Sequence, residues 1–182
     1  TAVAVTESDA GSDVASIRTR AKRDGDVWVL NGSKMFITNG VHADLVFVAA
    51  RTDTSAKGSR GLSIFAVKKG TPGFRVGRAL KKSGWLASDT AELVFEDCRI
   101  PTDQLSGEEN AGFYAIMRNF QTERIALGSM AVGHCLTALD LAYRYVNERK
   151  AFGGRSQLPP LDSSTAWLRR MTSAFSRLPF GL

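Results

Sequence analysis

The hydrophobic period of this sequence changes once, near residue 105, and that change limits the folds open to the chain. From Thr1 to about Ile100 the apolar residues form short runs, each closed by Gly, Asn, Asp or Pro, with no helical stretch between them. Closely spaced runs of this kind predict an antiparallel β-barrel or sandwich rather than a doubly wound sheet. The turn sequence "RDGD" before "VWVLNG" predicts a hairpin through Asp24 and Gly25.

Beyond Gly112 the apolar residues recur at helical spacing and form two stripes. They predict one long helix that begins near Gly112 and ends near Arg149. Two stripes require burial on more than one side, so the helix belongs in a bundle, yet the chain supplies no second clear helix. The expected fold class is α+β: an antiparallel β-barrel or sandwich followed by a long helix from an incomplete helical bundle. The stripes are Phe113, Ile116, Met117, Phe120, Leu127 and Ala131, and Ile125, Val132, Leu136, Leu139, Tyr143 and Val146.

Composition indicates a globular protein, because 43% of the residues are hydrophobic and 23% are charged. The two cysteines imply no disulfide framework and favour a reducing, cytoplasmic setting. We see no metal-ligand spacing and no apolar run near the ~20 residues of a membrane span. Of the net charge of +6, residues 151–182 contribute four arginines against one aspartate, which is +3 and half of the excess. This is a weak case for nucleic acid, so we expect no such partner.

The segment "TESDAGSD", residues 6–13, gathers small and hydroxylated residues around Gly11 at the end of a strand. Backbone N–H groups and the hydroxyls of Thr6 and Ser12 can approach a polar ligand closely in such a loop. A tight turn with Asx and Ser caps would have the same sequence.

The segment "KMFITNG", residues 34–40, places Phe36 and Thr38 two residues apart, hence on one side of a strand. An aromatic face beside a hydroxyl suits a flat heteroaromatic ligand. A half-buried sheet face would look the same.

The segment "TERIAL" places Glu123 on the predicted helix between Phe120 and Leu127, on or beside an apolar stripe. A carboxylate there is costly unless it is paired or used, and desolvation would raise its pKa toward the range of a general base. The alternative is a boundary residue whose carboxylate reaches solvent.

Five motifs, in order and at matching spacing, resemble the acyl-CoA dehydrogenase family of flavin enzymes. They are "VTESDAGSD", "LNGSKMFITNG", "LVFEDCRIP", "NAGFYAIMRNFQTERIALGSMAVG" and "YVNERKAFG", and they cover Thr1 to about Gly153. The resemblance implies a middle β-domain over residues 1–104, the start of a helical domain over 105–153 and an atypical tail over 154–182. It implies FAD-dependent α,β-dehydrogenation of an acyl-CoA thioester, in a truncated piece whose own activity is in doubt. The alternative is a non-catalytic β-domain that binds a ligand or a partner.

The resemblance also implies roles for single residues. Glu123 matches the catalytic base of the isovaleryl and long-chain branch, whereas most other relatives take the base from a later segment. Ser12 and Arg124 would contact or orient the substrate, and Arg149 would reach a flavin phosphate, commonly in a neighbouring subunit. The other implied flavin-binding residues are Val3, Val5, Thr6, Gly11, Ser12, Phe36, Ile37 and Thr38.

The same resemblance implies electron-transferring flavoprotein as the electron acceptor and a homo-oligomer in intact relatives. It places the protein in the cytoplasm, or in the mitochondrial matrix if the source is eukaryotic. After "AFG" the sequence departs from the family pattern, and the abrupt change of composition is the basis of a hypothesis that the tail is a frame-shifted or otherwise aberrant end.

Overall fold

The computed structural model of the chain describes residues 1–56, 58–151 and 153–155. It divides into two compact units, Thr1–Thr122 and Glu123–Leu182, and each is described by itself. The elements in chain order are β1 (Ala2–Ala4), the 3-10 turn η1 (Val14–Ser16), β2 (Arg20–Asp24), β3 (Val27–Thr38), β4 (Leu45–Arg51), β5 (Leu62–Lys68), β6 (Phe74–Ala79), β7 (Thr90–Pro101), the 3-10 turn η2 (Thr102–Gln104), β8 (Leu105–Ser106), α1 (Gly112–Glu148), β9 (Lys150–Ala151) and β10 (Gly154–Arg155).

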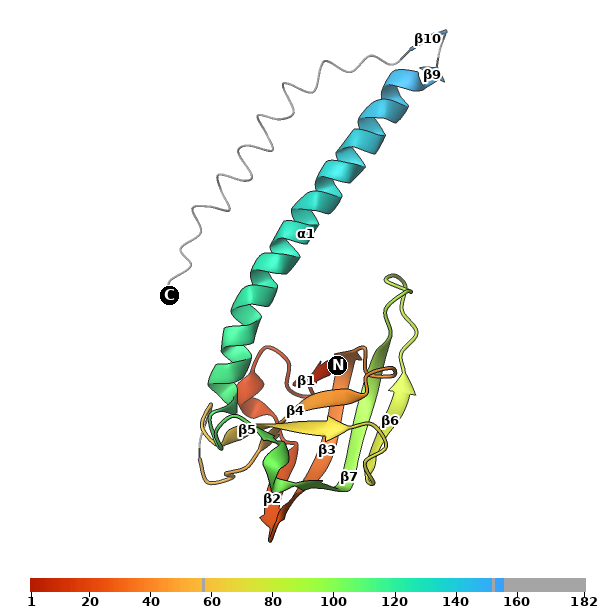
Figure 1. The fold of residues 1–182 in the computed structure, drawn as a ribbon. Coiled ribbons are helices and arrows are strands. Elements are labelled where there is room, and N and C mark those ends of the chain that lie inside the picture. Colours follow the sequence, from red (N-terminus) through yellow and green to blue (C-terminus); the bar gives the residue numbers. More distant parts are fainter. Residues whose placement is uncertain (57, 152, 156–182) are drawn as a thin grey trace. The chain divides into compact units, whose positions relative to one another are not determined.

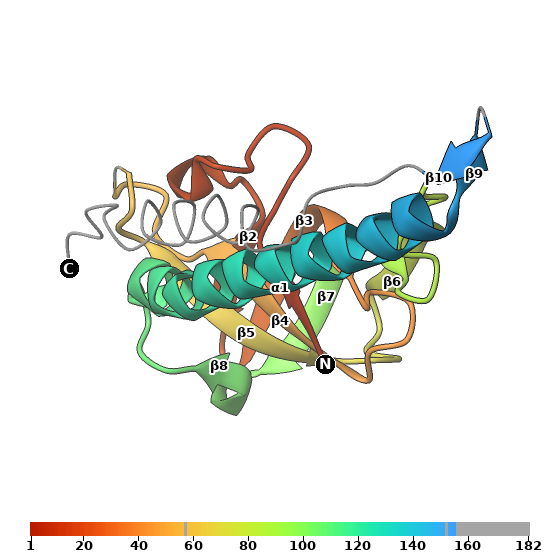
Figure 2. The same ribbon diagram turned by 90° about the horizontal axis from the view of Figure 1, so that it is seen from above.

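The first unit is built on one mixed eight-stranded sheet in the order β6-β7-β3-β2-β4-β5-β8, with β1 paired to β4 (Figure 1). The short strand β8 pairs with β5 (Figure 2). Most neighbours are antiparallel, but β1 runs parallel to β4, and β2 meets β4 in a parallel pairing of Arg20 with Arg51. The predicted β architecture is confirmed, and its purely antiparallel character is wrong for these two pairings. Apolar runs reveal that strands exist, but they do not reveal which distant strand each one joins.

The main core lies between the inner faces of strands that cross one another. Figure 1 shows β4 and β5 running across β3 and β7, and buried side chains of all four strands form a single cluster. Trp28 on β3 and Phe65 on β5 meet edge to face, with ring centroids 5.2 Å apart. Alternate residues of β4 and of the second half of β5 contribute to this cluster, as alternation in a half-buried strand requires.

Strand β3 continues through Gly32, where the sequence predicted the end of a shorter strand. The register with β7 shifts between Leu30 and Gly32, and Gly32 has a φ of +146°. A Cβ at this position would lie 2.6 Å from Oγ1 of Thr19. Glycine is therefore required both by the backbone conformation and by the close approach of the segment after η1.

Replacing Gly32 with alanine should lower the free energy of unfolding by about 1–3 kcal/mol, because the new methyl group meets Thr19 in a strained backbone region. Urea unfolding would measure the loss. Gly84→Ala is the matched control, since a Cβ there meets nothing within 4 Å. Equal stability of the two variants would contradict the close approach.

The predicted long helix is confirmed as α1, within a residue of both expected ends. Its first residue lies tightly against β5, because a Cβ on Gly112 would be 2.9 Å from the carbonyl oxygen of Leu62. The loop just before α1 is also fixed to β5, because the Asn110 backbone N–H donates to Oγ of Ser63 at 2.8 Å. Ile116, one turn further, is buried among residues of the loop between β1 and β2.

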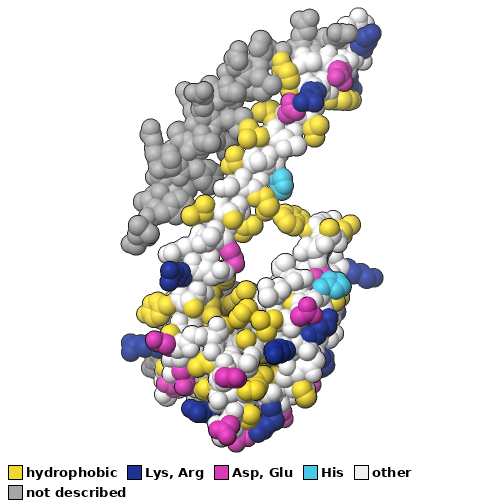
Figure 3. Space-filling view, in the orientation of Figure 1, with side chains coloured by type: hydrophobic (Ala, Val, Ile, Leu, Met, Phe, Trp, Pro, Cys, Tyr) yellow, Lys and Arg dark blue, Asp and Glu magenta, His cyan; other side chains and the backbone are white. Residues whose placement is uncertain are grey.

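Along the second unit, α1 carries apolar side chains that the described residues leave exposed (Figure 3). They include Ile125, Leu127, Leu136, Leu141 and Tyr145. Beyond Thr122 the two predicted stripes are therefore present, and the described residues include no second α-helix that would cover them. α1 is long and apolar enough to cross a membrane, but the core helix of a soluble bundle can have the same length and composition. The expected absence of a membrane span therefore stays a prediction, and the tail from residue 156 onward lies outside the described residues.

Candidate functional site

Two segments singled out in the sequence lie side by side in the first unit. The Met35 backbone N–H donates to the Thr6 carbonyl oxygen at 2.8 Å, and the side-chain amide of Asn39 donates to the Thr1 carbonyl at 2.9 Å. The chain from Thr1 to Thr6 therefore follows the end of β3. The structure thus brings the loop Val3–Ser12 beside Phe36 and Thr38.

Phe36 and Thr38 both point away from the core. Phe36 is 65% exposed and Thr38 is exposed, whereas Ile37 between them is buried in the main core. Any contact of Ile37 with a cofactor would therefore come from its backbone. Phe36 has a φ of +60° within a register shift between Lys34 and Ile37, a conformation that costs a bulky residue free energy. Alternation predicted the shared side of this pair but not the strained backbone.

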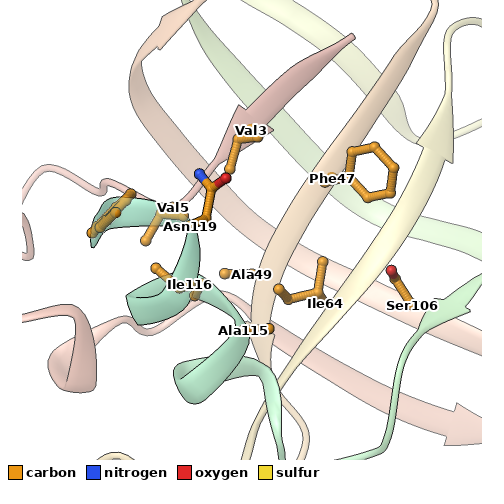
Figure 4. A pocket seen from close by; sticks show the side chains of 10 residues that line it. Val3, Val5, Phe47, Ala49, Ile64, Ser106, Ala115, Ile116 and Asn119 are labelled. Carbon is orange, nitrogen blue, oxygen red and sulfur yellow. The ribbon is translucent and has the colours of Figure 1, made fainter. Parts of the chain in front are cut away.

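The loop Val3–Ser12 begins against an apolar cavity of about 150 Å³ (Figure 4). Val3 and Val5 form one part of its wall, and Phe120 from the first turns of α1 forms another. Apart from Ser106 and Asn119 the lining side chains are apolar. This lining suits an apolar group better than a polar one.

The far part of the loop is tightly turned and open to solvent. Glu7 and Ala10 exchange backbone hydrogen bonds of 2.8 and 3.3 Å, which closes the turn before Gly11. Gly11 and Ser12 are exposed, Thr6 is half-buried, and a Cβ on Gly11 would meet nothing within 4 Å. The space around Gly11 is therefore free on the side of the described chain, as a loop that receives a ligand requires.

A buried ion pair, which the sequence motifs did not reveal, holds this loop to β3. Lys34 has a fully buried side chain whose Nζ donates to the Val5 carbonyl at 2.9 Å and to Oε1 of Glu7 at 2.8 Å. The Glu7 side chain is 10% exposed, and its carboxylate also accepts the backbone N–H groups of Arg18 at 2.6 Å and Thr19 at 2.9 Å. One carboxylate therefore joins the loop, β3 and the segment that leads into β2.

The two partners respond differently to burial. Burial lowers the pKa of Lys34 to about 8, and Glu7 opposes only part of that shift. Burial also disfavours the Glu7 carboxylate, but Lys34 and the hydrogen bonds from Thr19 and Arg18 outweigh it, so the pKa of Glu7 lies below its ordinary value of 4.5. Burial dominates the pKa of Lys34 because its ammonium is wholly buried. It does not dominate the pKa of Glu7, because several donors stabilise the carboxylate.

The lowered pKa of Glu7 predicts a loss of stability in acid. A carboxyl whose folded pKa lies below its unfolded pKa contributes stability above the unfolded value and loses it as pH falls through the folded value. We expect the free energy of unfolding to decrease below about pH 4.5. Urea titrations between about pH 6 and about pH 3 would measure the slope, which should be shallower in Glu7→Gln. Identical slopes in the two proteins would contradict the assignment.

The other end of the loop region is fixed by Arg51 on β4. Its guanidinium donates to the carbonyl of Ala15 at 2.6 Å, and more weakly to that of Ile17 at 3.4 Å. It also donates to the Arg60 carbonyl at 3.1 Å, so one side chain joins η1 to the loop between β4 and β5. The segment from residue 3 to residue 19 is thus fixed at both ends by buried or half-buried cations.

The predicted base and the two predicted arginines belong to the second unit. Glu123, Arg124 and Arg149 are exposed on or just beyond α1. The Arg149 guanidinium lies 5.8 Å from the ring centroid of Tyr145. The exposure of Glu123 agrees with a boundary residue rather than with a desolvated carboxylate, and its catalytic role stays a prediction. Within the described residues, no group of His, Cys, Asp and Glu could hold a metal ion.

Comparison with known protein families decides the relationship of this chain. Residues 2–98 match the model of the acyl-CoA dehydrogenase middle domain, and residues 110–159 match that of the acyl-CoA dehydrogenase C-terminal domain. The chain belongs to the acyl-CoA dehydrogenase family. The resemblance inferred from the five motifs is confirmed.

Curated relatives in the acyl-CoA dehydrogenase family align over 153 residues, 84% of this chain. The mitochondrial long-chain specific acyl-CoA dehydrogenase of Mus musculus is 49% identical, and the mitochondrial isovaleryl-CoA dehydrogenase of Pongo abelii is 42% identical. The crystal structure of acyl-CoA dehydrogenase from Geobacillus kaustophilus is 44% identical, with a TM-score of 0.83 over 96% of this chain and 45% of that one. The chain spans about 36% of the length of the two curated relatives.

Proposed function

We propose that this chain is the middle β-domain and the start of the C-terminal domain of an FAD-dependent oxidoreductase that dehydrogenates an acyl-CoA thioester. The observation that carries the proposal is the loop Val3–Ser12, held beside Phe36 and Thr38 in a chain that matches both family domains. Relatives named for long-chain acyl-CoA and isovaleryl-CoA support this substrate class.

The residues along this edge fit a flavin in their chemistry. Exposed Phe36 offers a flat aromatic face, and Thr38 offers a hydroxyl on the same side of β3. The turn that holds Gly11 and Ser12 is open on the side of the described chain and presents polar groups to a ligand. These residues, with Val3, Val5 and Thr6, would hold FAD, and Arg149 would reach a phosphate of FAD bound to a neighbouring copy.

The proposed chemistry assigns separate tasks to the substrate-binding residues. Glu123 takes the proton from the α-carbon of the acyl group as a general base. FAD, when bound, would supply the acceptor for the hydride that leaves the β-carbon. Arg124 orients the site, and Ser12 contacts the substrate. The resemblance implies that the long-chain and isovaleryl branch carries its base at the position of Glu123, and relatives named for these two substrates support this assignment.

The proposal extends to partners and location. Electron-transferring flavoprotein would accept the electrons, and copies of the complete chain would assemble into a homo-oligomer. The exposed apolar residues of α1 agree with a helix that needs further partners. The protein would act in the cytoplasm, or in the mitochondrial matrix of a eukaryotic source, as the mitochondrial names of two relatives suggest.

The visible absorption spectrum of the purified chain, before and after addition of FAD and then an acyl-CoA, tests this function. We expect FAD to be retained and its band to bleach on addition of the acyl-CoA. Glu123→Gln should retain FAD but bleach about 10²–10⁴-fold more slowly, because the general base is lost. Glu148→Gln, a matched change on the same helix, should bleach at the wild-type rate. Equal rates in all three proteins would place the base elsewhere.

A second candidate is a β-domain that binds a ligand or partner without catalysis, with Glu123 inert. The exposure of Glu123 among the described residues favours it. FAD uptake without any bleaching would support this candidate. A folded chain that takes up no FAD would contradict flavin binding by this chain.

A further inference from the structure

We propose that Lys34 and Glu7 are positioning residues that fix the loop Val3–Ser12 in the conformation that receives its ligand. The inference rests on the proposed function in taking that ligand to be FAD. Neither side chain is assigned a contact with flavin or substrate. Both act through the loop backbone.

The contacts of Lys34 show how the loop is fixed. Lysine is almost never fully buried unless it is paired, yet the Lys34 side chain has no exposed surface. Its Nζ donates to the Val5 carbonyl at 2.9 Å and to the Glu7 carboxylate at 2.8 Å, which are two points on the same loop. The Met35 backbone N–H adds a bond of 2.8 Å to the Thr6 carbonyl between them. Three successive loop residues are therefore set against β3.

Glu7 extends the same restraint to the far end of the loop. Its carboxylate accepts the backbone N–H groups of Arg18 and Thr19, eleven and twelve residues later. The turn that carries Gly11 and Ser12 lies between these anchored points. Residues on both sides of this turn are buried in an apolar cluster with the start of α1, so this cluster and the anchors at Glu7 and Arg18 together set where the turn stands.

Replacing Lys34 and Glu7 with an apolar pair of similar volume would leave the first unit about equally stable, since desolvation offsets much of the gain from a buried ion pair. What an apolar pair cannot supply is direction: the ammonium and the carboxylate bind particular carbonyl and N–H groups. Such directed contacts fix a loop to the fraction of an ångström that ligand recognition requires. The pair therefore stands where precision is needed, between the core and the polar face of the loop.

Hydrogen exchange and FAD titration of Lys34→Met provide the test. Methionine keeps the bulk of the lysine stem, and Glu7 keeps its two backbone donors, so the variant should fold. We expect the amides of Arg18, Thr19 and Met35 to exchange about tenfold faster or more beyond any acceleration of the core amide of Leu30, which reports the loss of global stability. The Kd for FAD should rise about 10–100-fold, by analogy with the loss of outer-shell partners at metal sites. Lys69→Met, which removes an exposed Nζ bond to the Val41 carbonyl, should change neither readout.

Several outcomes would overturn the inference. Equal acceleration at Leu30 and at the loop amides would show that Lys34 supports only global stability, and unchanged exchange would show no role in holding the loop. Unchanged FAD affinity alongside a loosened loop would remove the link to the ligand. If the wild-type chain takes up no FAD, the proposed function fails for this chain, while the exchange data still decide whether the pair holds the loop. If Lys34→Met does not fold, Glu7→Gln replaces it with the same expected pattern.

Discussion

Replacing Glu7 with leucine should lower the free energy of unfolding by about 3–5 kcal/mol, the cost of leaving one member of a buried ion pair without its partner. In this variant the fully buried ammonium of Lys34 keeps only the Val5 carbonyl. Its pKa, already lowered to about 8, falls further because Glu7 no longer raises it. The backbone N–H groups of Arg18 and Thr19 also lose their acceptor. Urea unfolding at neutral pH would measure the loss.

The controls for Glu7→Leu separate a buried pair from an exposed one. Glu96→Leu makes the same change in the exposed pair with Arg75, where Nη2 and Oε1 are 3.3 Å apart, and should cost about 0–1 kcal/mol. The double variant Glu7→Leu with Lys34→Met should recover part of the loss, because no unpaired charge remains in the core. If the double variant loses the sum of the two single losses, the pair does not behave as one unit.

The burial of Lys34 could not be predicted from alternation along β3. Buried Trp28 is in phase with Lys34, but so is Phe36, which is exposed. The register shifts on either side of Lys34 decide which of the two it follows. The identity of the partner as Glu7 could not be predicted, because it depends on how β1 and the following loop return to β3.

The local features of the fold were predictable from the sequence, whereas the pairings between distant strands were not. The period of α1 and the turn at Gly25 are local, so the expected helix and hairpin were found at the expected residues. The parallel pairing of β1 with β4 depends on contacts between distant segments, and the sequence period carries no information about it. The register shift that leaves Phe36 at a positive φ is equally hidden, since it comes from the fit of β3 to β7.

The candidate site was predictable as far as motifs reach. The five motifs placed Val3–Ser12, Phe36 and Thr38 in one site, and the first unit brings these segments together. Spacing also placed Glu123 on an apolar stripe, but a stripe is buried only when another element covers it. Among the described residues Glu123 and Leu127 remain exposed. A short segment thus shows which residues share a helix face but not whether that face is covered.

Replacing Phe65 with alanine should lower the free energy of unfolding by about 3–5 kcal/mol, because the change leaves a cavity in the main core. Phe65 has no exposed surface and meets Trp28 edge to face at 5.2 Å. Its neighbours come from strands that cross, so they cannot all move inward to fill the space. Urea unfolding would measure the loss, with near-ultraviolet circular dichroism, to which Trp28 contributes, as a second signal.

Phe36→Ala is the matched control, since it removes the same side chain from a surface position of β3. Phe36 is 65% exposed, so its loss should change the free energy of unfolding by no more than about 0.5 kcal/mol. Affinity for FAD should respond in the opposite way: weaker by about 2–10-fold in Phe36→Ala, the worth of an aromatic stacking contact, and unchanged in the folded fraction of Phe65→Ala. Comparable stability losses in the two variants would mean that Phe36 is a packing residue. The strained φ at Phe36 would then have no ligand to explain it.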